Sequence, residues 1–246
     1  MDVLWLFLAA GATALATGLG AVPVFFLGSK AEMLRPILLG GAIGAMTVAS
    51  LAGLLRPALQ EGGRLSVAGG LTAGALFLIG ASFLLGRREV HVGELRGTGV
   101  RLSVLVFGVL LVHSLPEGLA IGTAYASDRA GLSLFVILAI GLQNIPEGTS
   151  VAVPMETAGF RRSSQFWAAV LTSAPQPVGA VVAYLLVERI EGLLPFSFAF
   201  AAGAMLTLVA VELVPQAFTR WRWAGAAAGT LAGAGVMLAL AVALQV

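Results

Sequence analysis

Long apolar runs recur from one end of the chain to the other, and they limit its fold more than any other feature. The first, Val3 to Leu27, holds 25 residues without one charged side chain. About 20 consecutive apolar residues suffice to cross the hydrocarbon core of a bilayer as a helix. Only 11% of the residues are charged and 59% are hydrophobic, a balance that excludes an ordinary soluble domain. Because the runs are continuous and do not alternate with polar residues, they predict helices and not a transmembrane barrel.

We expect an all-α polytopic membrane protein with eight transmembrane helices. Their predicted ranges are 3–27, 36–56, 65–86, 101–127, 131–156, 163–188, 194–219 and 223–245. The longest connector, residues 87–100, leaves no room for a soluble domain, so residues 1–246 are expected to form a single transmembrane domain. The first run follows Asp2 without a basic leader, and we interpret it as a retained span and not as a cleaved signal peptide. The chain has no cysteine, so disulfides and thiolate metal sites are excluded.

The basic residues are divided unevenly between the connectors. Ten of the 14 Lys and Arg residues lie in the connectors after the first, third, fifth and seventh predicted spans, and four lie in those after the second, fourth and sixth. Cytoplasmic connectors are the ones enriched in Lys and Arg. The count therefore predicts that the N-terminus and the C-terminus both lie outside.

The fourth and fifth predicted spans carry the same short motif. Residues 113–118 read His-Ser-Leu-Pro-Glu-Gly, and residues 143–148 read Gln-Asn-Ile-Pro-Glu-Gly. Consecutive spans run in opposite directions, so the two motifs form an inverted pair. A weaker echo joins Gly-Ala-Met at 44–46 to Gly-Ala-Met at 203–205, which chance alone could produce in such a composition. We expect inverted repeats arranged as 3+2+3 spans, an arrangement typical of secondary transporters.

Both motifs are expected near the middle of the membrane. Arg101 lies 12 residues before His113, and Arg161 lies 14 residues after Glu147. At about 1.5 Å per residue each gap spans roughly half a bilayer. A charged side chain at that depth costs about 3 kcal/mol or more, so an intramembrane carboxylate indicates a functional site.

The spacing within each motif predicts a metal site. His113 and Glu117 are four residues apart and share one helix face, as do Gln143 and Glu147. Two such faces together offer an imidazole nitrogen, an amide oxygen and two carboxylates, which are ligands for a divalent transition metal. The two carboxylates and a dication sum to zero charge, which removes most of the cost of burying them.

Each of these residues also has a simpler interpretation. His113 alone could be a hydrogen-bonded packing residue, Gln143 could join two helices, and the two glutamates could relay protons. The alternative function left open is a proton-coupled carrier of a small organic solute that uses the same glutamates. An intramembrane metallohydrolase would need a His-Glu-x-x-His motif, which the chain lacks, so no enzyme activity is expected. A purely structural role leaves the paired glutamates unexplained.

The motifs, the span count and the topology resemble the ZIP (Zrt/Irt-like) metal-ion transporters, in particular their bacterial GufA-like branch, over nearly the whole chain. The resemblance implies that His113, Glu117, Gln143 and Glu147 are the transport-site ligands and that Met46 lines the site. It implies zinc as the first substrate, with cadmium, iron, manganese or cobalt as further candidates, and no resident cofactor. It further implies an elevator-like motion that delivers metal to the cytoplasm, with the second and seventh helices moving alongside the fourth and fifth. A homodimer in a bacterial inner membrane, with lipid and metal but no nucleic acid as partners, completes the expectation.

Some positions depart from the family pattern. Relatives hold a second metal beside the first, and its further ligands would come from positions that are Ser114, Asn144 and Gln176 here, none of them ionisable. We therefore expect one well-formed metal site with a weak or absent neighbour. Glu212, eight residues before Arg220, is expected on the exit path toward the cytoplasm. The connector 87–100 holds a single histidine, His91, so metal sensing there is expected to be weak.

Overall fold

The computed structural model describes residues 2–86, 98–190, 192–219 and 222–246, and within these ranges every regular element is helical. The elements that correspond to the expected spans are, in chain order, α1 (Val3–Leu19) with α2 (Val22–Leu27); α3 (Arg35–Val48), η2 (Ala49–Leu55) and α4 (Arg56–Glu61); α5 (Arg64–Gly86); α6 (Thr98–Ala126); α7 (Ala130–Thr157); α8 (Arg162–Thr172) with α9 (Pro175–Arg189); α10 (Leu193–Leu208), η3 (Val209–Leu213) and α11 (Val214–Ala217); and α12 (Trp223–Ala243). A short 3₁₀ segment, η1 (Gly28–Met33), follows the first span.

Seven of these spans are long and apolar enough to cross a membrane, counted over the described residues. The expected span that is not among these seven is the fourth, α6, a helix of 29 residues. Large apolar side chains cover the outer surface, among them Phe26, Leu65, Leu231 and Val242. An apolar surface of this extent requires lipid or protein to cover it. The chain is therefore a multi-pass integral membrane protein, while the count of eight and the orientation of the termini stay predictions.

The second span is longer than expected. Its predicted end at residue 56 is wrong, since α4 continues to Glu61. Pro57 stands at the first turn of α4, directly after η2, so its missing N–H leaves a carbonyl of the preceding turn without its helical partner. His91, named above for metal sensing, lies outside the described residues.

Four spans are interrupted, and the interruptions come in matching pairs. The first span breaks between α1 and α2, and the sixth breaks between α8 and α9, each with a proline at the start of the second piece. The second and seventh spans both pass through a π-helical segment, η2 and η3, each followed by a proline. Pro57 and Pro215 cannot donate to the carbonyls of Gly53 and Val211, and this disturbs the regular ladder at those points.

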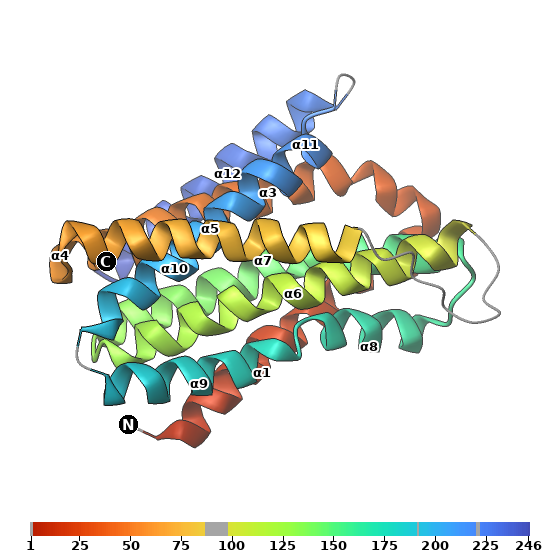
Figure 1. Cartoon of the computed structure of the whole chain (residues 1–246). Helices are drawn as coiled ribbons and strands as arrows, with labels where there is room; N and C mark the ends of the chain where they lie inside the picture. The colour runs from red at the N-terminus through yellow and green to blue at the C-terminus, as the bar shows by residue number, and fades with distance from the viewer. Residues whose placement is uncertain (1, 87–97, 191, 220–221) are drawn as a thin grey trace.

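The helices form two bundles (Figure 1). In the first bundle, α6 packs along α9, α1 packs along α7, and α6 and α7 lie side by side. In the second bundle, α3 packs along α12 and α5 packs along α10. The bundles meet where α3 lies against α7 and where α10 lies against α6. Figure 1 shows α3 and α12 together on one side and α8, α9 and α1 on the other.

Glycines allow the helices within each bundle to touch backbone to backbone. A Cβ atom added to Gly122 of α6 would lie 2.0 Å from the carbonyl oxygen of Ala180 in α9. A Cβ added to Gly229 of α12 would lie 2.1 Å from the carbonyl oxygen of Ile37 in α3. Small residues are the usual means of close helix packing in membranes, where lipid offers apolar side chains as good an environment as the protein.

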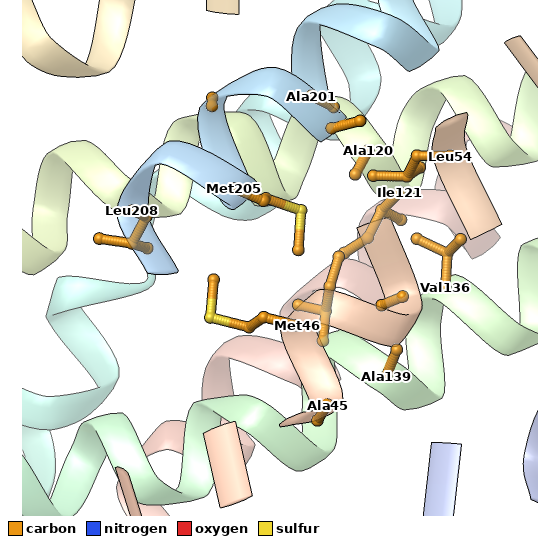
Figure 2. Close-up of a cluster of buried hydrophobic side chains, with 14 of the residues drawn as sticks. Ala45, Met46, Leu54, Ala120, Ile121, Val136, Ala139, Ala201, Met205 and Leu208 are labelled. Carbon is orange, nitrogen blue, oxygen red and sulfur yellow. The ribbon is translucent and has the colours of Figure 1, made fainter. Parts of the chain in front are cut away.

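Side chains, and not bare backbones, fill the main part of the contact between the bundles. Met46 of α3 and Met205 of α10 extend into the same region, with Ile121 of α6 and Ala139 of α7 close by (Figure 2). All four are buried, and Met46 is fully so. The two methionines belong to the repeated Gly-Ala-Met triplets, so the weaker sequence echo joins two segments that face each other.

Candidate metal site

Glu117 lies at the centre of a buried polar cluster in the first bundle. Its carboxylate is fully buried and accepts two hydrogen bonds from side-chain amides. Gln143 Nε2 of α7 donates to Glu117 Oε1 at 3.0 Å, and Gln176 Nε2 of α9 donates to Glu117 Oε2 at 2.6 Å. The carboxyl groups of Glu117 and Glu147 also lie close enough to interact. Two carboxylates are thus held together in the interior.

The helices α6 and α7 present these groups because both stay helical through their motifs. Pro116 and Pro146 lie inside the continuous helices α6 and α7. The four-residue spacing therefore places the two polar side chains of each motif on one face of the helix, and this face is turned inward. The four predicted ligands are all at most 3% exposed: His113, Glu117, Gln143 and Glu147.

Several atoms of these ligands have no hydrogen-bond partner, although they are buried. They are Nδ1 of His113, Oε1 of Gln143 and Oε1 of Glu147; Nε2 of His113 also makes no hydrogen bond, but it faces the carboxylate of Glu212. Nearly all buried polar atoms in proteins are paired, and an unpaired one calls for an explanation such as a bound ion or ligand. Apart from Nε2 of His113, the described residues hold six such atoms, and half of them belong to the predicted ligands. The donor types and their unused lone pairs fit a divalent cation.

The predicted ligands are not yet gathered around a single point. Among the described ranges of the chain, no three side chains drawn from His, Cys, Asp and Glu converge as metal ligands would. Glu117, Gln143 and Glu147 are together, whereas His113 faces a different carboxylate: its Nε2 lies 3.3 Å from Oε1 of Glu212. Closing the site requires His113 to turn from Glu212 toward the two motif glutamates.

Glu212 reaches this histidine from the second bundle. It stands in the π-helical segment η3, and its Oε1 also accepts a hydrogen bond of 2.7 Å from Ser82 Oγ of α5. The side chain is 17% exposed. The structure thus places Glu212 directly beside a predicted ligand, at the contact between the two bundles.

The residues predicted at the neighbouring, weaker position satisfy one another. Ser114 donates to the backbone oxygens of Leu110 and Thr172. Asn144 and Gln176 exchange hydrogen bonds through their side-chain amides, and all three predicted residues are at most 1% exposed. Every side-chain polar atom of this group has a partner, which contrasts with the unpaired atoms of His113, Gln143 and Glu147.

Sequence reasoning missed three residues of this region. Thr13 of α1 donates to Oε1 of Gln176 at 2.8 Å, and neither its type nor its spacing gave a signal. Ser82 donates a hydrogen bond to Glu212, and its residue type and spacing gave no signal either. Met205 did carry a signal, the Gly-Ala-Met echo, but a common apolar triplet is too weak a pattern to assign a residue to a site.

One cavity lies apart from these residues. It has a volume of about 310 Å³ and opens at the end of α4, where its lining includes Arg56, Gln60 and Arg129. None of the predicted metal ligands lines it. The four predicted ligands are buried side chains of the interior, away from this cavity.

Comparison with known proteins gives a consistent result. A family profile described as ZIP Zinc transporter matches residues 85–241. The zinc transporter GufA of Myxococcus xanthus is 34% identical, over 82% of this chain and 84% of its own length, and the zinc transporter ZIPB of Bordetella bronchiseptica is 29% identical, over 93% and 78%. A putative zinc transporter of Arabidopsis thaliana is 36% identical over 84% of this chain, which spans only 33% of the plant protein.

Proposed function

Because the chain belongs to the ZIP zinc transporter family and resembles its GufA-like members, we propose that it carries divalent metal ions, zinc first among them, into the cytoplasm. The ligands proposed are His113, Glu117, Gln143 and Glu147, with Met46 lining the site. The observation that carries this assignment is the set of unpaired acceptor atoms on buried side chains of α6 and α7. A dication beside two carboxylates gives a site without net charge, which lowers the free-energy cost of burying these groups in a membrane.

The donor set also bears on which metals are carried. Imidazole nitrogen favours zinc, cadmium, iron and cobalt over magnesium and calcium, and the oxygen donors still admit manganese. Zinc stands first because the related proteins are named zinc transporters. No resident cofactor is part of the proposal, since the metal is the cargo.

One ion per crossing is the stoichiometry we propose. On the far side of Glu117, the polar atoms of Ser114, Asn144 and Gln176 are paired with one another and with the backbone. A second cation there would have to break those hydrogen bonds and would find no further carboxylate. The site next to the first is therefore weak or absent.

The movement proposed is an elevator-like shift of the first bundle against the second. The backbone-to-backbone glycine contacts support it, because among the described residues they join helices of the same bundle, with the exception of Gly131 of α7, which approaches the Leu244 carbonyl oxygen. The earlier expectation grouped the second and seventh helices with the moving unit, but α3 and α10 pack most closely with α12 and α5. We therefore assign them to the stationary bundle.

Several further features belong to the proposal. Inverted repeats of 3+2+3 spans are supported by two pairs of features: the breaks in the first and sixth spans, and the π-helical segments in the second and seventh. With both termini outside, Glu212 would receive the ion from His113 on the way to the cytoplasm. A single transmembrane domain, a homodimer and a bacterial inner membrane complete the proposal.

Zinc flux into proteoliposomes tests the function. The variant Glu117→Ala with Glu147→Ala is compared with Glu32→Ala with Glu61→Ala, which removes two carboxylates outside the site. We expect saturable flux in the wild type and in the second variant, and none in the first. Absence of zinc flux in the wild type at several pH values, together with a proton flux that a solute drives, would favour the proton-coupled carrier instead.

A further inference from the structure

A chain of hydrogen bonds leads from α1 to the central carboxylate. Thr13 Oγ1 of α1 shares its hydroxyl proton between Gln176 Oε1 and the Ala10 backbone oxygen, each at 2.8 Å, and Gln176 Nε2 donates to Glu117 Oε2 at 2.6 Å. Asn144 of α7 joins the same network, because its Nδ2 donates to Gln176 Oε1 at 3.1 Å and to the Thr13 backbone oxygen at 2.7 Å. One residue from each long helix of the first bundle takes part.

Gln176 is the residue through which this network passes. A side-chain amide has two N–H donors and an oxygen with two lone pairs, and Gln176 uses both ends. Its Nε2 also donates to Asn144 Oδ1 at 3.3 Å, so the amide donates twice and accepts twice. The side chain is fully buried. It cannot rotate without breaking all four bonds, and hydrogen-bonded amides of this kind reinforce one another in a low-dielectric interior.

The orientation of Glu117 follows from this anchor. Oε1 of Glu117 faces Gln143, a proposed ligand, whereas Oε2 is turned to Gln176. We infer that Gln176 is a positioning residue for the cargo site: anchored by Thr13 and Asn144, it holds the Glu117 carboxylate in the orientation that presents one oxygen to the ion. The inference rests on the proposed function, because it assigns a role within the same metal site. Partners that orient metal-ligating carboxylates affect metal affinity by about 10- to 100-fold.

Replacing Gln176 with methionine removes all four bonds and nearly conserves the side-chain volume. For Gln176→Met we expect the dissociation constant for zinc, measured on purified protein in detergent, to rise by about 10- to 100-fold. The KM of zinc flux in proteoliposomes should rise by a similar factor, with kcat changed far less, because the network lies within one bundle and not at the contact between bundles. A structural defect alone would lower the amount of active protein and leave the KM unchanged.

Thr13 provides a finer test with conservative variants. Thr13→Val keeps the shape but removes the hydroxyl donor, so Gln176 loses one of its anchors; zinc should bind more weakly, by less than in Gln176→Met. Thr13→Ser keeps the hydroxyl, so this variant should bind zinc with the affinity of the wild type. If Gln176→Met does not fold, this pair still decides the matter, since equal zinc affinity in Thr13→Val and Thr13→Ser would overturn the inference.

Gln165 is the matched control. It is another fully buried glutamine of the first bundle, in α8, and it donates to Glu156 and to the Phe160 backbone oxygen, away from Glu117. Gln165→Met should lose stability to a comparable extent and bind zinc like the wild type. Equal weakening in both glutamine variants, or no weakening in Gln176→Met, would overturn the positioning role. A wild type that binds no zinc would overturn the proposed function, and the inference with it.

Discussion

Buried side chains around Glu117 separate into two groups by whether their polar atoms are paired. On one side, His113, Gln143 and Glu147 keep acceptor atoms without partners. On the other side, Asn144 and Gln176 form a closed set of hydrogen bonds. An unpaired buried acceptor destabilises a protein by about 1–3 kcal/mol. If the proposed function holds, the first group destabilises the metal-free protein and is satisfied when a cation binds.

Glu147→Gln tests this trade between stability and binding. It removes a buried carboxylate while keeping its shape, so the metal-free protein should unfold at the same temperature or higher. Zinc flux should fall by at least about 100-fold, more than for the loss of a residue that only supports a ligand. The measurements are thermal unfolding in detergent and flux in proteoliposomes, with Glu61→Gln as the control that keeps full flux. A Glu147→Gln protein with normal flux would remove Glu147 from the site.

At the proposed metal site, protons should compete with the metal for the two carboxylates. Lowering the pH protonates Glu117 and Glu147, and a protonated carboxyl group is a poor ligand, so zinc affinity should fall as pH falls and recover as it rises. Affinity should change by up to about tenfold per pH unit for each proton released on binding. Zinc titrations at several pH values measure the slope, which should be smaller in Glu147→Gln. Affinity that does not change with pH would argue against carboxylate ligands.

At the scale of elements, the sequence predicted the spans well and their interruptions poorly. The apolar runs located α5, α7 and α12 to within a few residues, because hydropathy reports directly on lipid. The π-helical turns in η2 and η3 carry no composition signal of their own, since they arise where a proline leaves a carbonyl unbonded inside a tightly packed span. The expected helix at 163–188 in fact breaks at Ser173 and Ala174, although Pro175 marked the position.

The candidate site shows the same division. The repeated Pro-Glu-Gly motif was enough to single out His113, Glu117, Gln143 and Glu147, because intramembrane acids are rare. The hydroxyl of Thr13 and its bond to Gln176 could not be predicted, since they depend on how α1 meets α9 in space. The contact between His113 and Glu212 likewise depends on packing between the two bundles.

Close helix packing can be tested on a single element. In α12, a Cβ added at Gly229 would collide with the backbone of α3, whereas nothing lies within 4 Å of one added at Gly235. Gly229→Ala should therefore destabilise the protein by about 1–3 kcal/mol, while Gly235→Ala should be neutral or stabilising by up to about 1 kcal/mol. Thermal unfolding of both variants in the same detergent checks the difference, and equal effects would contradict the close approach of α12 to α3.

At the scale of the molecule, two pairs of hydroxyl groups report on the proposed motion. Thr123 of α6 and Ser197 of α10 lie across the contact between the bundles, with their oxygens 2.6 Å apart. Thr17 and Ser173 lie within the first bundle, with their oxygens 2.7 Å apart. The chain has no cysteine, so each pair can be replaced by two cysteines without interference from native thiols.

Oxidising the two cysteine pairs should have opposite effects. A disulfide in place of Thr123 and Ser197 would fix one bundle to the other, so zinc flux should stop and return when a reductant is added. A disulfide in place of Thr17 and Ser173 joins parts that move together, so flux should persist. Flux that continues through a complete disulfide between the bundles would exclude the elevator-like movement.

All four proposed ligands belong to α6 and α7, two helices of one bundle. An ion held by them would cross the membrane with its coordination sphere unchanged. The protein would therefore select the ion only once, when it first binds. No second set of ligands would select among ions during the crossing itself, before Glu212 receives the ion on the cytoplasmic side. The protein's discrimination between zinc and a competing metal would equal the ratio of their loading affinities, and the relative abundance of metals outside would pass directly into the composition of what is delivered.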